Sequence, residues 1–487
     1  MRTGRRRFQG MIMSAWLGFT ATAYAEGNDL GAAKSMTLDD YVQRAIDIGI
    51  TGVKNSLSLK TAGYAREIVF RQNEAPTASV GYTQNRQGSE TNGVLTDLSR
   101  SNSTDLKVTE NTALGTALSA TGSYGSQTDA NLASTGGAPI TSTTGKPALA
   151  LSGSQPIYLF VKNPVARALR RADLAFADAE AGFLSTKLNI RTQARSNYYA
   201  VMQAEEAIQV AKRKADSSQK LLDVTQALVN AGKSAPVETM RAKITLQTDQ
   251  RALNNAMVTH NQAILTAKNY IFMPLDQDIQ FISKLTFKPF TVSLDKIISY
   301  AMLHQPNLQI LRRAQETALL DYQAALEPTR PALSVNGTYN YARQPVDLFA
   351  LTEYVRGWSW TLNANWLFFD SGVTRDQVRE AQIERTVADL NLTDGERTTQ
   401  LNIRNAYMDV IRTAGQIAEF QTSRDQAQRD VDVLRLRFQN GLATLLDVFD
   451  GENSVRDLDT EYLGLLVQFN QSKDNLSTQV GADVDTL

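Results

Sequence analysis

The chain has 487 residues with 50 basic and 50 acidic side chains, so its net charge gives no reason to expect nucleic acid or a charged membrane surface as a partner. Cysteine is absent and only two histidines occur, His260 and His304. This composition excludes disulfides, thiolate metal sites and an acylated N-terminal cysteine, and it argues against histidine-based catalysis or metal binding. We therefore expect no cofactor and no metal.

The first 25 residues (1–25) have the pattern of an export signal. A basic segment with Arg2, Arg5, Arg6 and Arg7 precedes the apolar stretch Met11–Ala21, and Ala23-Tyr24-Ala25 provides a cleavage site. The basic segment also resembles a twin-arginine signal, but we favour the general secretory route. After residue 25 no apolar run is long enough to cross a bilayer as a helix. We therefore expect an exported chain that is either water-soluble or inserted in a membrane as a β-barrel.

The rest of the chain contains two copies of one unit. "SNYYAVMQAEEAI" in the first copy resembles "RNAYMDVIRTAGQI" in the second. Gly232 corresponds to Gly441 and Asn261 to Asn470, and both pairs are 209 residues apart. This constant offset indicates a duplication. We expect a first repeat over 26–289 and a second over 290–487.

Each repeat is expected to hold the same elements in the same order. The first has a short helix, strands with an extended loop over about 85–147, a long helix over about 163–231, a helix over about 234–272 and a linker. The second has a short helix, strands over about 331–369, a long helix over about 372–440 and a helix over about 443–480. Small and apolar residues three and four positions apart, from Val201 to Val229 for example, are typical of a coiled coil. A helix from Pro164 to Val229 would be ~100 Å long, so these helices are rods and not parts of a compact core.

The expected strands have a membrane-type pattern. From Trp358 to Phe368, apolar residues alternate with serine, threonine and asparagine, and aromatic residues lie near both ends. Shorter alternations begin at Leu149 and Leu333. Such alternation is typical of a transmembrane strand, although a soluble antiparallel sheet with one buried face has the same period. Together with the export signal, the pattern favours a barrel.

A barrel in lipid has to close, because an open edge leaves backbone groups without hydrogen bonds. Each repeat shows about two clear strands, so one chain supplies about four, and the smallest common barrels have eight. We therefore expect several chains to share one barrel. The segment 103–146 is long, and its alternation from Leu118 to Tyr124 fits an extra hairpin in the barrel wall or at its outer end. Its glycine, serine and threonine content also fits a mobile loop.

With these features the chain resembles the TolC-like outer membrane efflux family over essentially its whole mature length. The strings that carry the resemblance are "SQPIYLFVKNPVARALRRADLA", "AMLHQPNLQILRRA", "NWLFFDSGVTRDQVREAQ" and "LRFQNGLATLLDVFDGENSV". Their order, spacing and duplication are specific to this family. The missing cysteine separates the chain from the family's lipoprotein branch.

The resemblance implies an α+β fold in a homotrimeric channel-tunnel, with a shared 12-stranded transmembrane β-barrel joined to a long α-helical coiled-coil barrel. It implies a place in the outer membrane of a Gram-negative bacterium, with the helices in the periplasm and lipid around the barrel. Its partners would be a periplasmic adaptor (membrane fusion) protein and an inner-membrane pump or ABC transporter. Such a protein is a passive exit duct of an efflux pump or a type I secretion system, not an enzyme. The sequence does not distinguish drugs from proteins as cargo.

An exported coiled-coil protein without a channel, such as an adhesin or another surface protein, is the alternative function. The duplicated amphipathic strands favour the channel, because an adhesin needs no lipid-facing alternation. A water-soluble monomer recovered from the periplasm would support the alternative.

Asp447 and Asp450, three residues apart on a helix, are the candidate site. Paired carboxylates serve enzymes as acid and base or bind divalent ions, but no histidine, lysine cluster or phosphate loop accompanies them in the sequence. A solvated helix face is another explanation. In the family, a glycine at the turn corresponds to Gly441 and to Gly232 in the first repeat. In relatives, aspartates six and nine residues after the second-repeat glycine line the closed periplasmic entrance, and counting from Gly441 gives Asp447 and Asp450. A trimer would hold them as two rings of three carboxylates.

The residues that would lock this entrance match the family only in part. Phe438 and Ala443 stand where relatives have tyrosine and arginine. In the first repeat, Glu238 and Arg241 occupy the positions that correspond to Asp447 and Asp450. We hypothesise that Arg241 pairs with Asp447 or Asp450 in the closed state. The clustered carboxylates should raise the pKa of some of their members. His260 and His304 are expected to be packing residues.

Overall fold

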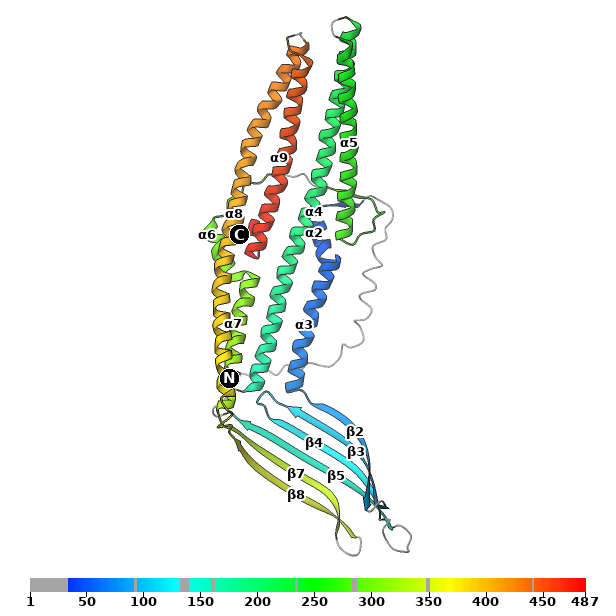
Figure 1. Cartoon of the computed structure of the whole chain (residues 1–487), viewed down its shortest axis with the longest axis vertical. Coiled ribbons are helices and arrows are strands. Elements are labelled where there is room, and N and C mark those ends of the chain that lie inside the picture. The colour runs from blue at the N-terminus through cyan, green and yellow to red at the C-terminus, as the bar shows by residue number, and fades with distance from the viewer. Residues whose placement is uncertain are drawn as a thin grey trace.

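The computed structural model describes residues 34–91, 94–131, 140–158, 163–232, 235–282, 287–346, 351–439 and 442–487. The expected export signal lies outside these residues. Long helices stand side by side on one end of an antiparallel sheet, and two helical hairpins reach furthest from it (Figure 1). The sheet and the hairpin tips therefore occupy opposite ends of an elongated molecule.

The duplication is visible in the helices. The first repeat contains α2 (Leu38–Asp47), α3 (Ile50–Glu74), α4 (Pro164–Asn230) and α5 (Pro236–Tyr270). The second contains α6 (Leu294–His304), α7 (Pro306–Ala325), α8 (Val373–Gln439) and α9 (Leu445–Val480). α4 and α8 have 67 residues each, so each is ~100 Å long. None of the described helices combines the length and the apolar composition that a membrane span needs.

Local sequence fixes where these helices begin. Proline is the first residue of α4, α5 and α7, where its missing N–H leaves no hydrogen bond unmade. The side chain of Asn163 caps α4 by accepting from the backbone N–H of Val165 at 2.9 Å. α4 then packs along α3, α5 and α9, and α8 packs along α7 and α9. Packing along their length, and not a central core, holds the helices together.

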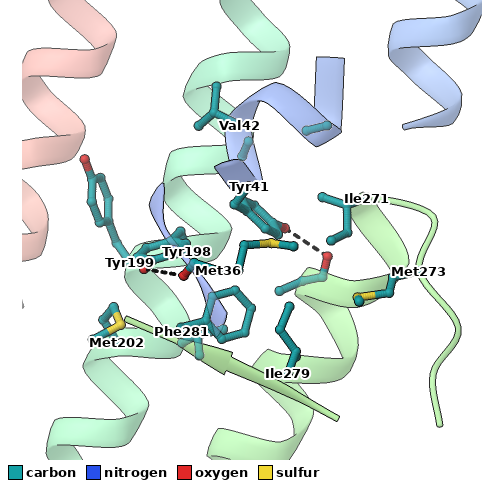
Figure 2. Close-up of a cluster of buried hydrophobic side chains, with 14 of the residues drawn as sticks. Met36, Tyr41, Val42, Tyr198, Tyr199, Met202, Ile271, Met273, Ile279 and Phe281 are labelled. Atoms are coloured by element: carbon teal, nitrogen blue, oxygen red, sulfur yellow. Dashed lines mark hydrogen bonds between the residues drawn. The ribbon is translucent and has the colours of Figure 1, made fainter. Parts of the chain in front are cut away.

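Two apolar clusters fix the middle of the helical layer, one for each repeat. In the first, Tyr41 of α2, Tyr198 of α4 and Phe281 of the short strand β6 (Ile279–Phe281) meet with ring centroids 5.2 to 5.9 Å apart (Figure 2). The Tyr41 hydroxyl donates to the carbonyl of Ala267 at 2.9 Å, and the Tyr198 hydroxyl donates to that of Met36 at 3.3 Å. Burial raises the pKa of Tyr41, so its hydroxyl stays protonated as a donor.

The strand β1 (Lys34–Met36) pairs in parallel with β6 beside this cluster. The second cluster is built from the equivalent elements of the other repeat, around Ile297 of α6, Ile403 of α8 and Phe469 of α9. Short 3₁₀ turns follow α7 (Glu327–Thr329) and α9 (Val484–Thr486). Arg195 of α4 forms a buried ion pair with Asp474 of α9, which ties the two repeats together.

The sheet has six strands in the order β2-β3-β4-β5-β7-β8, and each neighbouring pair is antiparallel. Their bounds are β2 (Thr77–Thr91), β3 (Val94–Asn111), β4 (Ala117–Asn131), β5 (Ile140–Ile157), β7 (Ala332–Val346) and β8 (Leu351–Asn365). β2 follows α3 and β8 precedes α8, so the edge strands of the sheet continue into the outer helices of the layer (Figure 1).

The estimate of about four strands per chain is wrong, and so is the extended loop over about 85–147. The described part of this segment forms the end of β2, all of β3 and β4 and the first part of β5, so the first repeat supplies four strands of this sheet and the second supplies two. Of the two alternatives for 103–146, a hairpin fits the described residues 103–131 and 140–146, and a mobile loop does not fit them. Alternation is hard to see here because the apolar positions of the hairpin include small or polar residues such as Gly122 and Thr104.

Candidate functional site

The two faces of the sheet differ sharply in polarity. Residues paired across antiparallel strands lie on the same face. We call one set of paired residues the apolar row, and it consists of Ala78, Val108, Ala120, Leu151, Tyr339 and Trp358. The next set of pairs lies on the opposite face. We call it the hydroxyl row, and it consists of Thr77, Thr109, Ser119, Ser152, Thr338 and Ser359.

The apolar face is uncovered in the single chain. Trp358 and Trp360 of β8 are 75% and 68% exposed, and Val80 of β2 is 74% exposed. Indole rings on an open face are costly in water but favourable in a bilayer, whose boundaries attract tryptophan and tyrosine. This face therefore has the composition of a lipid-facing surface.

The polar face holds its hydroxyl groups in cross-strand pairs. Hydroxyl oxygens lie 2.7 Å apart in the pair Thr77–Thr109, 2.6 Å apart in Ser119–Ser152 and 2.7 Å apart in Thr338–Ser359. Each hydroxyl keeps lone pairs free for water. Such a face can line an aqueous passage.

Asp447 lies at the opposite end of the molecule, in the first turn of α9. Its Oδ2 accepts from the backbone N–H and the hydroxyl of Thr444, both at 2.7 Å, and its own N–H donates to the Thr444 hydroxyl at 3.3 Å. This is a reciprocal capping box. The hydrogen bonds from the Thr444 side chain and backbone lower the pKa of the exposed Asp447 carboxyl. In the single chain, capping therefore acts against the rise in pKa expected from a carboxylate ring.

Sequence reasoning missed this capping role of Asp447. A visible signal for it is the string "TLLD", in which threonine precedes aspartate by three residues at a helix start.

Asp450, Glu238 and Arg241 are close to the same end. Asp450 is exposed in α9, one turn after Asp447. Arg241 in α5 is exposed, and its Nη1 lies 3.4 Å from Oε1 of Glu238 in the same helix. In the part of this chain that is described, no ion pair joins Arg241 to either aspartate. The hypothesised lock is therefore absent within one chain and would need an aspartate from a neighbouring copy.

The turn glycines are described unequally. Gly232 follows α4 with φ +72°, a conformation that favours glycine, and no atom of the described residues other than its chain neighbours lies within 4 Å of where its Cβ would be. Gly441 lies outside the described residues. Phe438 falls within α8, but its side chain is outside the described part of the structure.

A third glycine, Gly451 in α9, escaped the sequence prediction. A Cβ on Gly451 would lie 2.9 Å from Cδ1 of Leu434 and 3.1 Å from Cγ2 of Val431 in α8. The glycine therefore lets α8 and α9 approach closely one residue after Asp450. A glycine inside a helical pattern is the available signal, but its partner helix cannot be read from the sequence.

Uncovered apolar side chains also follow the two outermost long helices. On α3 they are Ile50, Val53, Leu57, Tyr64 and Ile68. On α8 they are Ile383, Val387, Leu390, Leu401, Met408 and Ile411. We call these the α3 stripe and the α8 stripe. The helices α3 and α8 lie on opposite sides of the helical layer (Figure 1). No group of three or more histidine or acidic side chains suited to a metal ion occurs among the described residues.

A family model described as outer membrane efflux protein matches residues 110–266 and 297–482, one segment in each repeat. The outer membrane protein TolC of Vibrio cholerae is 19% identical over 332 residues, which are 65% of this chain and 75% of that protein.

Two solved structures are similar in fold over nearly the whole chain. The open state of the Neisseria gonorrhoeae MtrE outer membrane channel has a TM-score of 0.67 at 14% identity, covering 92% of this chain and 89% of MtrE. The Campylobacter jejuni CmeC outer membrane channel has a TM-score of 0.65 at 15% identity, covering 91% of this chain and 85% of CmeC. At these identities the likeness concerns the fold alone.

Proposed function

The chain belongs to the outer membrane efflux protein family, and on this premise we propose that three copies of it close into one passive duct across the outer membrane. The family is a transport family whose members are the exit ducts of efflux pumps in the outer membrane. The sheet is the bilayer part of the duct and the helices extend into the periplasm.

One observation carries the proposal: the unpaired strand edges and the two uncovered apolar helix stripes belong to the same two lateral edges of the chain. β2 and β8 are edge strands with unpaired backbone groups on one side. The α3 stripe adjoins β2 and the α8 stripe adjoins β8, because the chain runs directly between each helix and strand. A neighbouring copy that joins β8 to β2 would also bring the α8 stripe onto the α3 stripe. Closure therefore satisfies the sheet and the helices together.

Closure also requires the edge strands to be antiparallel. β2 runs away from the helices and β8 runs back toward them, so β8 of one copy meets β2 of the next in the antiparallel sense (Figure 1). Copies can then be added around an axis until the ring closes. The polar face with the hydroxyl row lines the passage, and the apolar face contacts lipid.

At the periplasmic tip, the proposed trimer brings Asp447 and Asp450 together as two rings of three carboxylates. Such rings attract cations and repel anions at a narrow entrance. Asp447 keeps its charge through the cap on α9. Asp450 makes no side-chain hydrogen bond or ion pair with the described residues, so it is the better gate residue. Arg241 is exposed and can exchange its weak contact with Glu238 for an aspartate of the next copy.

The duct has no energy source of its own, so the proposal includes partners. A periplasmic adaptor would hold the tip open, and an inner-membrane pump or ABC transporter would deliver the cargo. The tip hairpins α4–α5 and α8–α9 offer the helical surface for this contact.

Conductance across planar bilayers tests the lock. If Arg241 pairs with an aspartate of the neighbouring copy, Arg241→Ala should raise the resting conductance of the purified trimer and Arg241→Lys should raise it less. Arg251→Ala, an exposed arginine further along α5, is the matched control. Unchanged resting conductance in Arg241→Ala would rule out the lock but not the duct. A water-soluble monomer in the periplasm would rule out the duct and favour a non-channel coiled-coil protein.

A further inference from the structure

We propose that the barrel of this protein is built from eighteen strands, six from each of three chains, and that its opening through the outer membrane is correspondingly wide. The inference rests on the proposed trimer and adds to it the role of the hairpin β3–β4. This hairpin raises the strand number from the four per chain that the sequence indicates to six. The question is whether the hairpin is part of the wall or an appendage beside it.

Its pairing places it in the wall. β3 pairs with β2 from Thr109 to Val94, and with β4 from Asn111 to Asp97. β4 pairs with β5 along its whole length, from Ala117 to Asn131. An appendage at the outer end would leave β2 and β5 adjacent, whereas here the hairpin separates them completely.

Both faces of the sheet continue through the part of the hairpin nearest the helices, whereas Thr104 and Asn102 further along β3 are polar residues on the apolar face. Val108 and Ala120 occupy the β3 and β4 positions of the apolar row, and Thr109 and Ser119 occupy those of the hydroxyl row. Further along β3, Leu106 lies on the apolar face, while Lys107 and Asp105 lie on the polar face. A strand outside the membrane would have no need to match the polarity of its neighbours at the positions from Asp105 to Thr109.

The turn of the hairpin is fastened to the helical layer. Residues 112–116 form a tight turn in which the Thr112 N–H donates to the Thr116 carbonyl at 3.0 Å, and Gly115 has φ +77°. The Asn163 side-chain amide donates to the Ala113 carbonyl at 2.7 Å, and that of Asn111 donates to the Gln72 carbonyl at 3.3 Å. The turn is thus held between the end of α3 and the start of α4, at the same level as the other strand ends.

The strand number sets the width of the barrel. With strands ~4.8 Å apart and tilted by ~40°, eighteen strands give a backbone diameter of about 36 Å, against about 24 Å for twelve. Barrels with 16 to 18 strands leave an aqueous channel even after side chains fill part of the interior. The barrel would then be wide at the membrane, and selection by size would depend on the periplasmic tip.

Electron cryo-microscopy of the full-length trimer in lipid nanodiscs would count the strands directly. The proposal expects eighteen strands, with β3 and β4 between β2 and β5 in each copy. A trimeric barrel of twelve strands with the hairpin outside the wall would overturn the inference and leave the proposed duct standing. A preparation without a trimer would overturn both.

Thiol labelling provides a second measurement, because the chain has no cysteine of its own. In cells, a membrane-impermeant maleimide should label Thr109→Cys and Ser119→Cys and leave Val108→Cys and Ala120→Cys unlabelled. The matched control is β8, with Ser359→Cys expected to react and Trp358→Cys expected not to. If β8 alternates but all four hairpin positions react equally, the hairpin is not in the wall.

Discussion

Gly451 allows a quantitative test of how the tip is packed. In Gly451→Ala, the new methyl group would approach Leu434 and Val431 of α8 to 2.9 and 3.1 Å. Leu434 is half-buried and can rotate, but Val431 is only 2% exposed and β-branched, so it cannot move without shifting α8. Overpacking of this kind costs about 1–3 kcal/mol.

The same substitution also removes a glycine from a helix, which stabilises by about 0.8–1.0 kcal/mol. The net expectation is a loss of up to about 2 kcal/mol per chain for Gly451→Ala, and a larger loss for Gly451→Val. Gly464→Ala in the same helix is the matched control, because among the described residues no atom outside its own helix backbone lies within 4 Å of its Cβ position. Gly464→Ala should therefore gain the helix propensity of alanine without any loss from overpacking.

Thermal unfolding of the detergent-solubilised trimer, followed by circular dichroism, measures the difference. Gly464→Ala should raise the apparent melting temperature, and Gly451→Ala should fall below it. Because α8 and α9 must separate near Asp450, Gly451→Val should also raise the resting conductance in planar bilayers. If Gly451→Ala were stabilised as much as Gly464→Ala, the close approach of α8 and α9 would be wrong.

Two further predictions concern a helix cap and a helix-to-turn contact. The lowered pKa of Asp447 means that its hydrogen bonds with Thr444 stabilise the fold above the ordinary carboxyl pKa, and that this contribution disappears as the pH falls through the lowered value. Asp447→Asn should therefore lower the melting temperature at pH 7, and the difference from the wild type should disappear in acid. Asp450→Asn should leave the melting temperature unchanged and reduce cation selectivity in bilayers. Asn163→Asp keeps the oxygen that caps α4 but loses the amide donated to Ala113, so a smaller loss of thermal stability than in Asn163→Ala is expected. No loss in Asn163→Asp would mean that the contact with the turn contributes nothing, and equal losses in the two variants would mean that the cap on α4 contributes nothing.

The sequence predicts most of the architecture because its signals are strong and repeated. The strict alternation that starts at Trp358 predicts the second half of β8, although the strand ends at Asn365 and not at Phe368. The constant offset between Gly232 and Gly441 predicts the duplicated helical hairpins. The resemblance to the outer membrane efflux family is confirmed by the match to residues 110–266 and 297–482.

What the sequence does not predict depends on contacts between distant segments. β3 and β4 have weak alternation, and only their pairing with β2 and β5 makes the apolar row continuous. The packing of Gly451 depends on its contact with Leu434 and Val431 of α8, and the sequence of α9 alone does not show which helix lies against it. The gate depends on neighbouring copies, and therefore the site residues at the tip remain a prediction.

The central claim is that the sheet crosses the outer membrane with its polar face around an aqueous passage. Single cysteines along β8, at Trp358, Ser359, Trp360 and Thr361, test it most directly when intact cells are treated with a membrane-impermeant maleimide. The account predicts labelling at Ser359 and Thr361 and protection at Trp358 and Trp360. Equal labelling at all four positions would contradict it.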